Sequence, residues 1–196
     1  MKETQGKTLG TREMVFGAIL TALVAILQLM GAFIKLGPFS VSLVLVPIVI
    51  GAAICSVKVG TWLGFVFGVT VLLSGDAAAF LAVDVFGTIA TVLVKGTLAG
   101  FLSAVTYKSL KGINTYVAVA AAAIVCPMVN TGVFLIGCLL FFMDTISMWS
   151  QSAGLGANVA KYMIFGLVGA NFLFEIGMNI ILSPVIVRLI NIRNKQ

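Results

Sequence analysis

Long apolar stretches follow one another along the chain, separated by short polar groups and by breaks such as Gly37-Pro38 and Gly75-Asp76. An α-helix needs about 20 apolar residues to cross roughly 30 Å of hydrocarbon, because each residue adds about 1.5 Å. Six stretches reach or approach this length: 14–34, 39–57, 59–73, 85–107, 116–142 and 159–190. The pattern therefore predicts an all-α integral membrane bundle of six transmembrane helices.

The six predicted spans differ in length. The third is short and the sixth is long, so we expect a thin span and a tilted or extended one. Only a few residues around Lys58 separate the second span from the third, and a single span there would be too long. We therefore expect a tight turn at Lys58. No linker interrupts the apolar pattern, which indicates one membrane domain over residues 1–196.

The composition agrees with a membrane environment. Apolar residues make up 61% of the chain and charged residues 9%, whereas soluble domains carry roughly 25% charged residues. The net charge is +6, but the basic residues stand singly at the ends of apolar runs. This spacing is typical of membrane topology and does not indicate a nucleic-acid partner.

The basic residues also predict an orientation, because cytoplasmic loops are enriched in lysine and arginine. Alternating the six spans places nine basic residues on one side and two on the other. The first side holds Lys2, Lys7, Arg12, Lys58, Lys108, Lys111, Arg188, Arg193 and Lys195, and the second holds Lys35 and Lys161. We therefore expect both termini to be cytoplasmic, in a multi-pass protein of the plasma membrane.

The sequence offers no apparent catalytic chemistry. It contains no histidine, which is the commonest general base and metal ligand. No GxSxG motif, nucleotide-binding P-loop or pair of closely spaced carboxylates is present. The three cysteines lack metal-ligand spacing. We therefore predict that the chain is not an enzyme and has no catalytic residues, metal site or cofactor of its own.

Two ionisable residues fall deep inside predicted spans, Lys95 in the fourth and Glu175 in the sixth. Each costs about 2.5–3.5 kcal/mol or more if it faces lipid, so both should face the bundle interior. They could form a mutual ion pair or line a cavity for a solute. Asn130 adds an amide on the fifth span, and Asn171 and Asn179 form one polar stripe with Glu175 on the sixth.

Cationic and aromatic residues flank the loops on the predicted outer side. They are Lys35, Phe39, Trp149, Lys161 and Tyr162. Aromatic residues at this depth serve either as interfacial anchors or as ligand contacts. The lysines would attract an anionic solute. Phe39, Trp149 and Lys161 are therefore candidate substrate-binding residues.

Small residues at intervals of four indicate close helix packing. They are Gly60, Gly64 and Gly68 in the third span, Gly96 and Gly100 in the fourth, and Ala18 and Ala22 in the first. Packing within the bundle explains each group. Contact with a partner subunit is the other interpretation of the pair on the first span.

Two long segments carry a family resemblance. The stretches GPFSVSLVLVPIVIGAAICSVKVGTWLGFVFGVTVLLSGD and FGTIATVLVKGTLAGFLSAVTYK resemble the S components, the substrate-binding subunits, of energy-coupling factor (ECF) transporters. The resemblance implies that the chain captures a vitamin from outside and works with a membrane T component and two cytoplasmic ATPases, which consume the ATP. The family's AxxxA docking motif for the T component matches Ala18 and Ala22.

Among the subfamilies, the chain looks most like the pantothenate type. Lys95 or Lys161 could pair with the carboxylate of pantothenate, while Asn130, Asn171 and Glu175 could bind its polar groups. Folate would fit the same reasoning, whereas riboflavin would need more ring-stacking residues than we can place from the sequence. Two other functions remain possible at this point: a proton-coupled secondary transporter using Lys95 and Glu175, and a membrane scaffold without a ligand.

Overall fold

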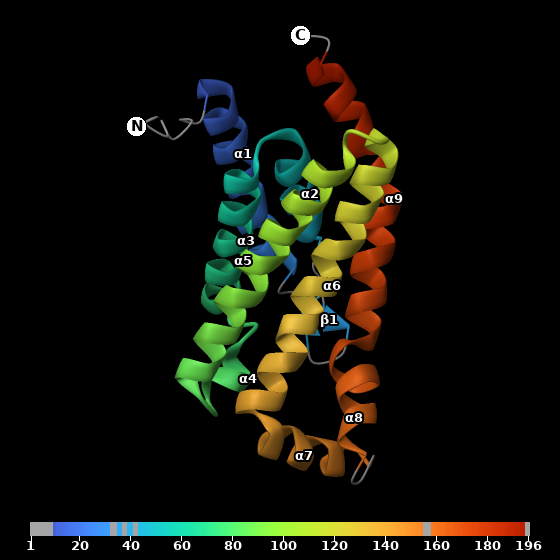
Figure 1. Cartoon of the computed structure of the whole chain (residues 1–196). Coiled ribbons are helices and arrows are strands. Elements are labelled where there is room, and N and C mark those ends of the chain that lie inside the picture. Colours follow the sequence, from blue (N-terminus) through green and yellow to red (C-terminus); the bar gives the residue numbers. More distant parts are fainter. Residues whose placement is uncertain (1–9, 32–34, 37–38, 41–42, 155–157, 195–196) are drawn as a thin grey trace, which may run out of the picture.

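The computed structural model describes residues 10–31, 35–36, 39–40, 43–154 and 158–194. Almost all of these residues are helical, apart from a small β-hairpin (Figure 1). The elements in chain order are α1 (Thr11–Gly31), β1 (Lys35–Leu36), β2 (Phe39–Ser40), α2 (Leu45–Ile54), α3 (Val57–Leu73), α4 (Ala78–Leu81), α5 (Val85–Leu110), α6 (Thr115–Phe141), α7 (Met143–Ser152), α8 (Val159–Lys161), the π-helix η1 (Tyr162–Val168) and α9 (Gly169–Asn194).

Four helical segments are long and apolar enough to cross a membrane: α1, α5, α6 and the continuous segment from α8 to residue 192 of α9. Two further apolar helices are shorter, with 10 residues in α2 and 17 in α3. At about 1.5 Å per residue, α2 is only about 15 Å long. The all-helical bundle predicted from the sequence is therefore present, with one helix much shorter than its predicted span, while the number of six membrane spans stays a prediction.

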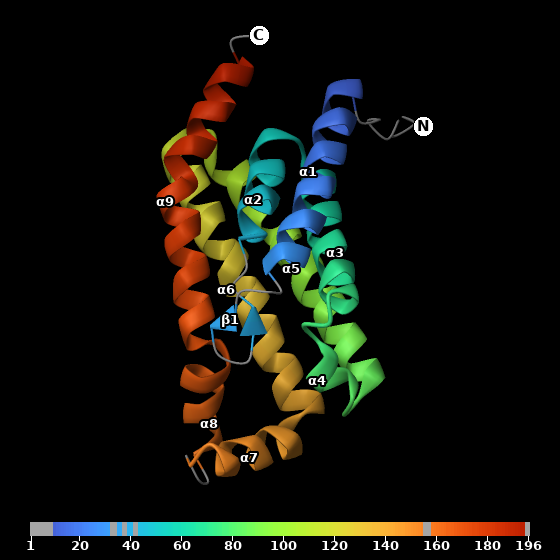
Figure 2. The same cartoon turned by 180° about the vertical axis from the view of Figure 1, so that it is seen from behind.

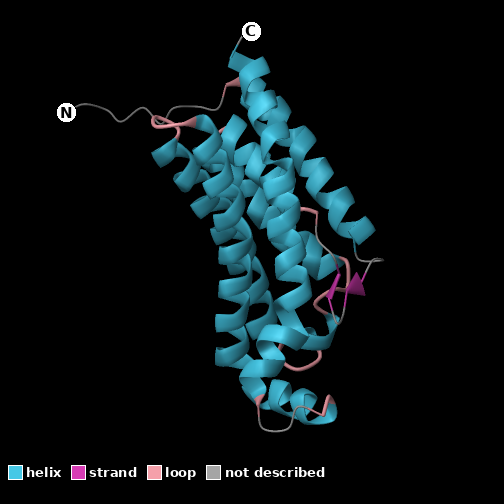
Figure 3. Cartoon of the chain, turned by 90° about the vertical axis from the view of Figure 1, so that its right-hand side faces the viewer, coloured by secondary structure: helices cyan, strands magenta, loops and turns pink. Residues whose placement is uncertain are grey.

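The shortening of α2 has a local cause. Strands β1 and β2 pair antiparallel, Lys35 with Ser40 and Leu36 with Phe39, so the predicted span 39–57 begins with a strand and its helix α2 starts at Leu45 (Figure 3). Pro47 lies in the first turn of α2, where a missing N–H breaks no helical hydrogen bond. The turn to α3 comes earlier than predicted, because Ser56 caps α3 and Lys58 already lies in its first turn.

The elements collect at two ends of the bundle. The start of α1, the end of α9, the α2–α3 turn and the α5–α6 turn share one end, which we call the terminal end (Figures 1 and 2). Helices α4 and α7 lie at the opposite end, which we call the α7 end. Lys58, in the first turn of α3, and Lys108, in the last turn of α5, therefore lie at the terminal end.

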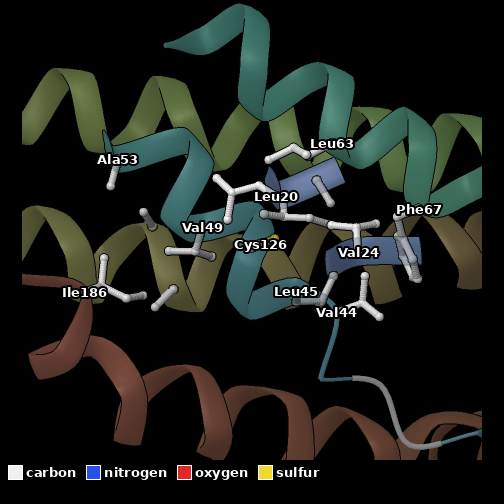
Figure 4. Packing of buried hydrophobic residues seen from close by; sticks show 14 of the residues in the cluster. Leu20, Val24, Val44, Leu45, Val49, Ala53, Leu63, Phe67, Cys126 and Ile186 are labelled. Atoms are coloured by element: carbon white, nitrogen blue, oxygen red, sulfur yellow. The ribbon is translucent and has the colours of Figure 1, made fainter. Parts of the chain in front are cut away.

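Helix α2 fills the interior of the terminal half. Eight of its ten residues are buried, and it contacts α1, α3, α5, α6 and α9. Leu45, Val49 and Ala53 of α2 lie among side chains of these neighbouring helices, including Leu20 of α1 and Leu63 of α3 (Figure 4). Such a helix hides its apolar surface from lipid on every side, so its short length exposes no backbone to hydrocarbon.

Glycine brings α3 and α5 into direct backbone contact. A Cβ atom on Gly64 would overlap the carbonyl group of Gly96, and one on Gly100 would overlap that of Gly60. These are the glycines whose spacing predicts close packing, and the structure confirms that prediction. The tight α3–α5 contact holds the cavity-facing side of α5 at a fixed depth in the bundle.

Candidate functional site

A cavity lies in the half of the bundle nearer the α7 end. It encloses about 770 Å³ of space, part of which is open to the surroundings. Its lining comes from α1, α3, α5, α6, η1 and α9 and from the short segments around α4 and α7. The lining residues are Gln28, Phe67, Val71, Asp76, Ala77, Phe80, Thr88, Thr91, Val92, Lys95, Asn130, Thr131, Phe134, Phe142, Leu167, Val168, Asn171, Phe172 and Glu175.

Helix α5 presents a polar stripe to the cavity. Asp84 caps this helix by accepting a hydrogen bond from the Gly87 amide at 3.0 Å. Thr88, Thr91 and Lys95 then follow on one helical face, three and four residues apart. The cap fixes where α5 begins, and the stripe follows from the spacing of these three residues.

The ammonium group of Lys95 lies over two aromatic rings. Its Nζ atom lies 5.6 Å from the centre of the Phe67 ring on α3 and 5.4 Å from that of Phe134 on α6. Both contacts are cation–π interactions, which strengthen where water is excluded. The two rings hold the cation at the cavity wall while leaving its N–H groups available to a ligand.

Helix α9 supplies the carboxylate side of the cavity. Asn171 and Glu175 line it one turn apart, and Glu175 is 6% exposed. Asn179 continues the predicted stripe but does not line the cavity. Its Nδ2 donates a hydrogen bond to the Glu175 carbonyl oxygen at 2.8 Å. Ser183 in turn donates to the Asn179 carbonyl oxygen at 2.8 Å. Asn179 and Ser183 therefore form hydrogen bonds with the backbone of α9.

Lys95 and Glu175 face the same cavity and act on each other electrostatically. In the described part of the chain they form no direct ion pair, since Lys95 contacts aromatic rings instead. Asn130 of α6, which is 6% exposed, interacts with the Glu175 carboxylate. Of the two sequence interpretations, the structure favours the cavity lining over a simple ion pair.

A second acidic group reaches the cavity from the segment between α3 and α4. The Gln28 side chain of α1 donates a hydrogen bond from Nε2 to Oδ2 of Asp76. Gln28 is 2% exposed, so this bond is shielded from solvent and links α1 to the cavity wall. The sequence signal for Gln28 is its position as the one amide inside the apolar run of α1.

Five phenylalanines give the cavity aromatic walls: Phe67, Phe80, Phe134, Phe142 and Phe172. Phe80 lies at the centre of an aromatic group, with ring centres 5.6 Å from Phe134 and 4.9 Å from Phe142, both edge to face. The expectation that the spans carry too few ring-stacking residues for an aromatic ligand is therefore wrong. These residues lie in apolar runs, where the sequence does not distinguish a cavity-facing ring from a lipid-facing one.

Two of the remaining candidate residues, Lys161 and Trp149, lie apart from the cavity lining. Lys161, at the end of α8, is exposed. Trp149 of α7 is half-buried and packs edge to face on Phe80 at 5.4 Å, so it supports a lining residue. The side chain of Phe39 lies outside the described residues. The structure thus brings together Lys95, Asn130, Asn171 and Glu175 from the candidate set.

A shallow groove runs between α1 and α3 on the outside of the bundle. It is lined by Glu13, Met14, Gly17, Ala18, Thr21, Lys58, Val59 and Trp62. The indole of Trp62 donates a hydrogen bond to the Thr21 hydroxyl at 3.1 Å. Ala18 and Ala22 are both exposed on α1, and Ala18 also lines the groove. The AxxxA pair therefore faces outward and does not serve packing within the described bundle.

Among the described residues, no group of three or more cysteine, aspartate or glutamate side chains is arranged to hold a metal ion. The polar groups of the cavity instead suit an organic ligand with hydrogen-bonding groups. They comprise one lysine, two carboxylates, three amides and three threonines.

Comparison with known families shows the family of the chain. Residues 12–187 match the family described as "ECF transporter, substrate-specific component". The chain belongs to this family. Searches of curated proteins and of solved structures gave no significant match. As an ECF S component, the chain is a membrane transport protein of a family that is not enzymatic. S components work with a T component and ATPases on vitamin-type substrates.

Proposed function

We propose that this S component captures a vitamin in the cavity lined by Lys95, Asn130, Asn171 and Glu175. The observation that carries the proposal is the convergence of these polar side chains from three helices on an otherwise aromatic cavity. Polar groups at membrane depth are costly unless they serve a ligand or each other. In a member of this transporter family, a bound vitamin would pair with these polar side chains.

Loading takes place from outside the cell in this proposal. The six apolar helical segments cross the plasma membrane, α2 only in part, and the terminal end faces the cytoplasm. The basic residues Lys58 and Lys108 at the terminal end support this orientation under the positive-inside rule. Asp76, Asp84 and Asp144 lie on the segments of the α7 end. The cavity is then nearer the outer surface.

Energy comes from partner subunits. The exposed pair Ala18 and Ala22 docks the T component, and two cytoplasmic ATPases hydrolyse ATP on its behalf. The chain itself uses no cofactor in this proposal. Small exposed residues four apart allow a partner helix to approach closely, which supports α1 as the docking helix.

Two kinds of vitamin are candidates. Pantothenate, favoured by the sequence, would place its carboxylate at Lys95 and its hydroxyl and amide groups at Asn130 and Asn171. A ring-containing vitamin such as riboflavin or folate is the second, and the five phenylalanines of the cavity favour it. Lys161 lies outside the cavity lining, which leaves Lys95 as the lysine that a carboxylate would meet there.

A proton-coupled secondary transporter is the alternative, because Lys95, Glu175 and Asp76 share one cavity and could relay protons. Uptake into vesicles separates the two functions. The S component on its own should give no uptake driven by a proton gradient, whereas the complex with its T component and ATPases should import the vitamin when ATP is supplied. Gradient-driven uptake by the lone chain would contradict the proposal.

The direct test is a vitamin screen against the purified chain by thermal shift and calorimetry. A ligand that binds only the folded state raises the apparent melting temperature. We expect one vitamin to bind at one site per chain. Absence of binding across the whole panel would contradict a substrate-binding role.

A further inference from the structure

The charged side chains of the cavity restrict the charge that its ligand can have. Three ionisable side chains line it: Lys95, Glu175 and Asp76. Lys95 is within electrostatic range of both carboxylates. If all three are ionised, the cavity carries one negative charge. An anionic ligand would add a second negative charge in a poorly solvated space, which is unfavourable.

A cationic ligand fits no better, because each carboxylate already has a partner. Asp76 accepts a hydrogen bond from the buried Gln28 amide. Glu175 faces the charge of Lys95 and interacts with Asn130. The charge of Lys95 would also repel a cation inside the cavity. Each carboxylate therefore already has a partner, and a ligand without net charge at its buried end disturbs these contacts least.

Two buried atoms show which neutral group is needed. Oγ1 of Thr91 and Oδ1 of Asn130 have no hydrogen-bond partner among the residues that the structure describes. Both residues are 6% exposed and line the cavity. A buried polar atom without a partner costs about 1–3 kcal/mol, so these atoms gain most from a ligand that pairs with them.

The cavity offers a ligand both donors and acceptors. Lys95 is a donor whose Nζ contacts ring faces, and Thr91 one turn away can donate or accept. Oδ1 of Asn130 is an acceptor only. A ligand therefore needs a carbonyl oxygen for Lys95 and an N–H group for Asn130. A cyclic amide, or lactam, presents these two groups side by side.

The walls determine the shape of the ligand body. Nζ of Lys95 lies 5.6 Å from the centre of the Phe67 ring and 5.4 Å from that of the Phe134 ring. A carbonyl that reaches Lys95 therefore comes close to both rings. Flat aromatic ring systems stack on such walls, whereas a branched aliphatic chain fills the gap poorly.

From these observations, and resting on the proposed function, we infer that the S component binds a flat heteroaromatic molecule through a neutral lactam edge held by Lys95, Thr91 and Asn130. The carbonyl accepts from Lys95, the ring N–H donates to Asn130, and the ring lies against Phe67 and Phe134. Pantothenate lacks the ring, and its open-chain trans amide directs its carbonyl and its N–H to opposite sides.

The test is calorimetry on the full chain in detergent with four kinds of probe. Riboflavin and pterin are neutral lactam rings, pantothenate is an aliphatic carboxylate, panthenol is its neutral alcohol, and thiamine is an aromatic cation. We expect riboflavin or pterin to bind at least about 100-fold more tightly than the other three, because a site built for paired hydrogen bonds rejects molecules lacking them. Tighter binding of pantothenate, panthenol or thiamine overturns the inference and leaves the proposed function intact. No binding by any probe or by the wider vitamin panel overturns both.

Variants check the assigned contacts with the lactam probe that binds. Thr91→Val keeps the side-chain shape and removes the hydroxyl, and we expect about tenfold weaker binding. Phe134→Leu should also cost on the order of tenfold through lost stacking. Phe165→Leu is the matched control, because Phe165 is 73% exposed and does not line the cavity. Unchanged affinity in both Thr91→Val and Phe134→Leu overturns the assignment.

Discussion

The ammonium group of Lys95 on α5 lies 5.4 Å from the centre of the Phe134 ring on α6. This contact joins the cation of the cavity to its aromatic wall. It allows Lys95 to remain inside the bundle without a direct carboxylate partner, because the ring face stabilises the charge while the N–H groups stay available. The first prediction follows from this arrangement.

Replacing Lys95 by methionine should weaken vitamin binding by about 10- to 100-fold. A hydrogen bond to a charged group contributes about 1.5–3 kcal/mol, and methionine keeps the apolar stem while removing the donor. Isothermal calorimetry with the vitamin identified by screening measures the change. Lys108→Met is the control, since Lys108 is exposed at the terminal end. Equal affinity of wild type and Lys95→Met would show that the ligand binds elsewhere.

Gln28→Glu should destabilise the protein and weaken ligand binding together. The change places a second carboxylate against Asp76, where the buried Gln28 amide now donates a hydrogen bond. Two like charges at hydrogen-bond distance repel strongly when shielded from water. Gln28→Met removes the bond without adding charge, so its effect on the thermal unfolding midpoint should be smaller. If the two variants unfold at the same temperature, the Gln28–Asp76 contact has no energetic role.

Gly64→Ala should lower the thermal unfolding midpoint by roughly 5 °C or more, because the new methyl group would overlap the Gly96 carbonyl and push α3 away from α5. The same substitution at Gly132 of α6 is the control. Nothing lies within 4 Å of a Cβ atom built there. Gly132→Ala should be neutral or slightly stabilising, since alanine favours a helix over glycine by about 0.5–1 kcal/mol. Similar midpoints for both variants would refute the close α3–α5 contact.

Ala18→Trp should prevent assembly with the T component and ATPases while leaving vitamin binding unchanged. Ala18 is exposed on α1 and lines the groove to α3, away from the cavity. Co-purification with tagged partner subunits measures assembly, and calorimetry measures binding. Leu173→Trp serves as the control, because Leu173 is 71% exposed on α9. Normal assembly of Ala18→Trp would exclude this face of α1 from the docking surface.

The sequence predicts the helical membrane bundle well, because bilayer thickness sets a length that apolar runs must match. It predicts α2 poorly. Residues 39–57 are apolar throughout, and periodicity cannot show that Leu45–Ile54 is a short helix enclosed by five others. A helix buried in protein and a helix exposed to lipid carry the same apolar residue types, so the composition does not distinguish them.

For the candidate site, the rarity of polar residues at membrane depth was the useful signal. Lys95, Asn130 and Glu175 stand out in apolar runs and line one cavity in the structure. The aromatic walls could not be predicted in this way, because Phe67 and Phe134 are chemically suited to either lipid or cavity. Lys161 was a candidate because of its charge near a loop. Such a position does not show whether a side chain reaches the cavity.

In the function that we propose, the cavity between α5, α6 and α9 holds a vitamin. Calorimetric titration of the screened vitamin into wild type and Asn130→Leu tests this binding, with thermal unfolding showing that the variant is folded. We predict one site per chain in wild type and at least about tenfold weaker binding in the variant, because the ligand loses its contact with Oδ1 of Asn130. Identical affinities for the two folded proteins would show that the vitamin does not bind in this cavity.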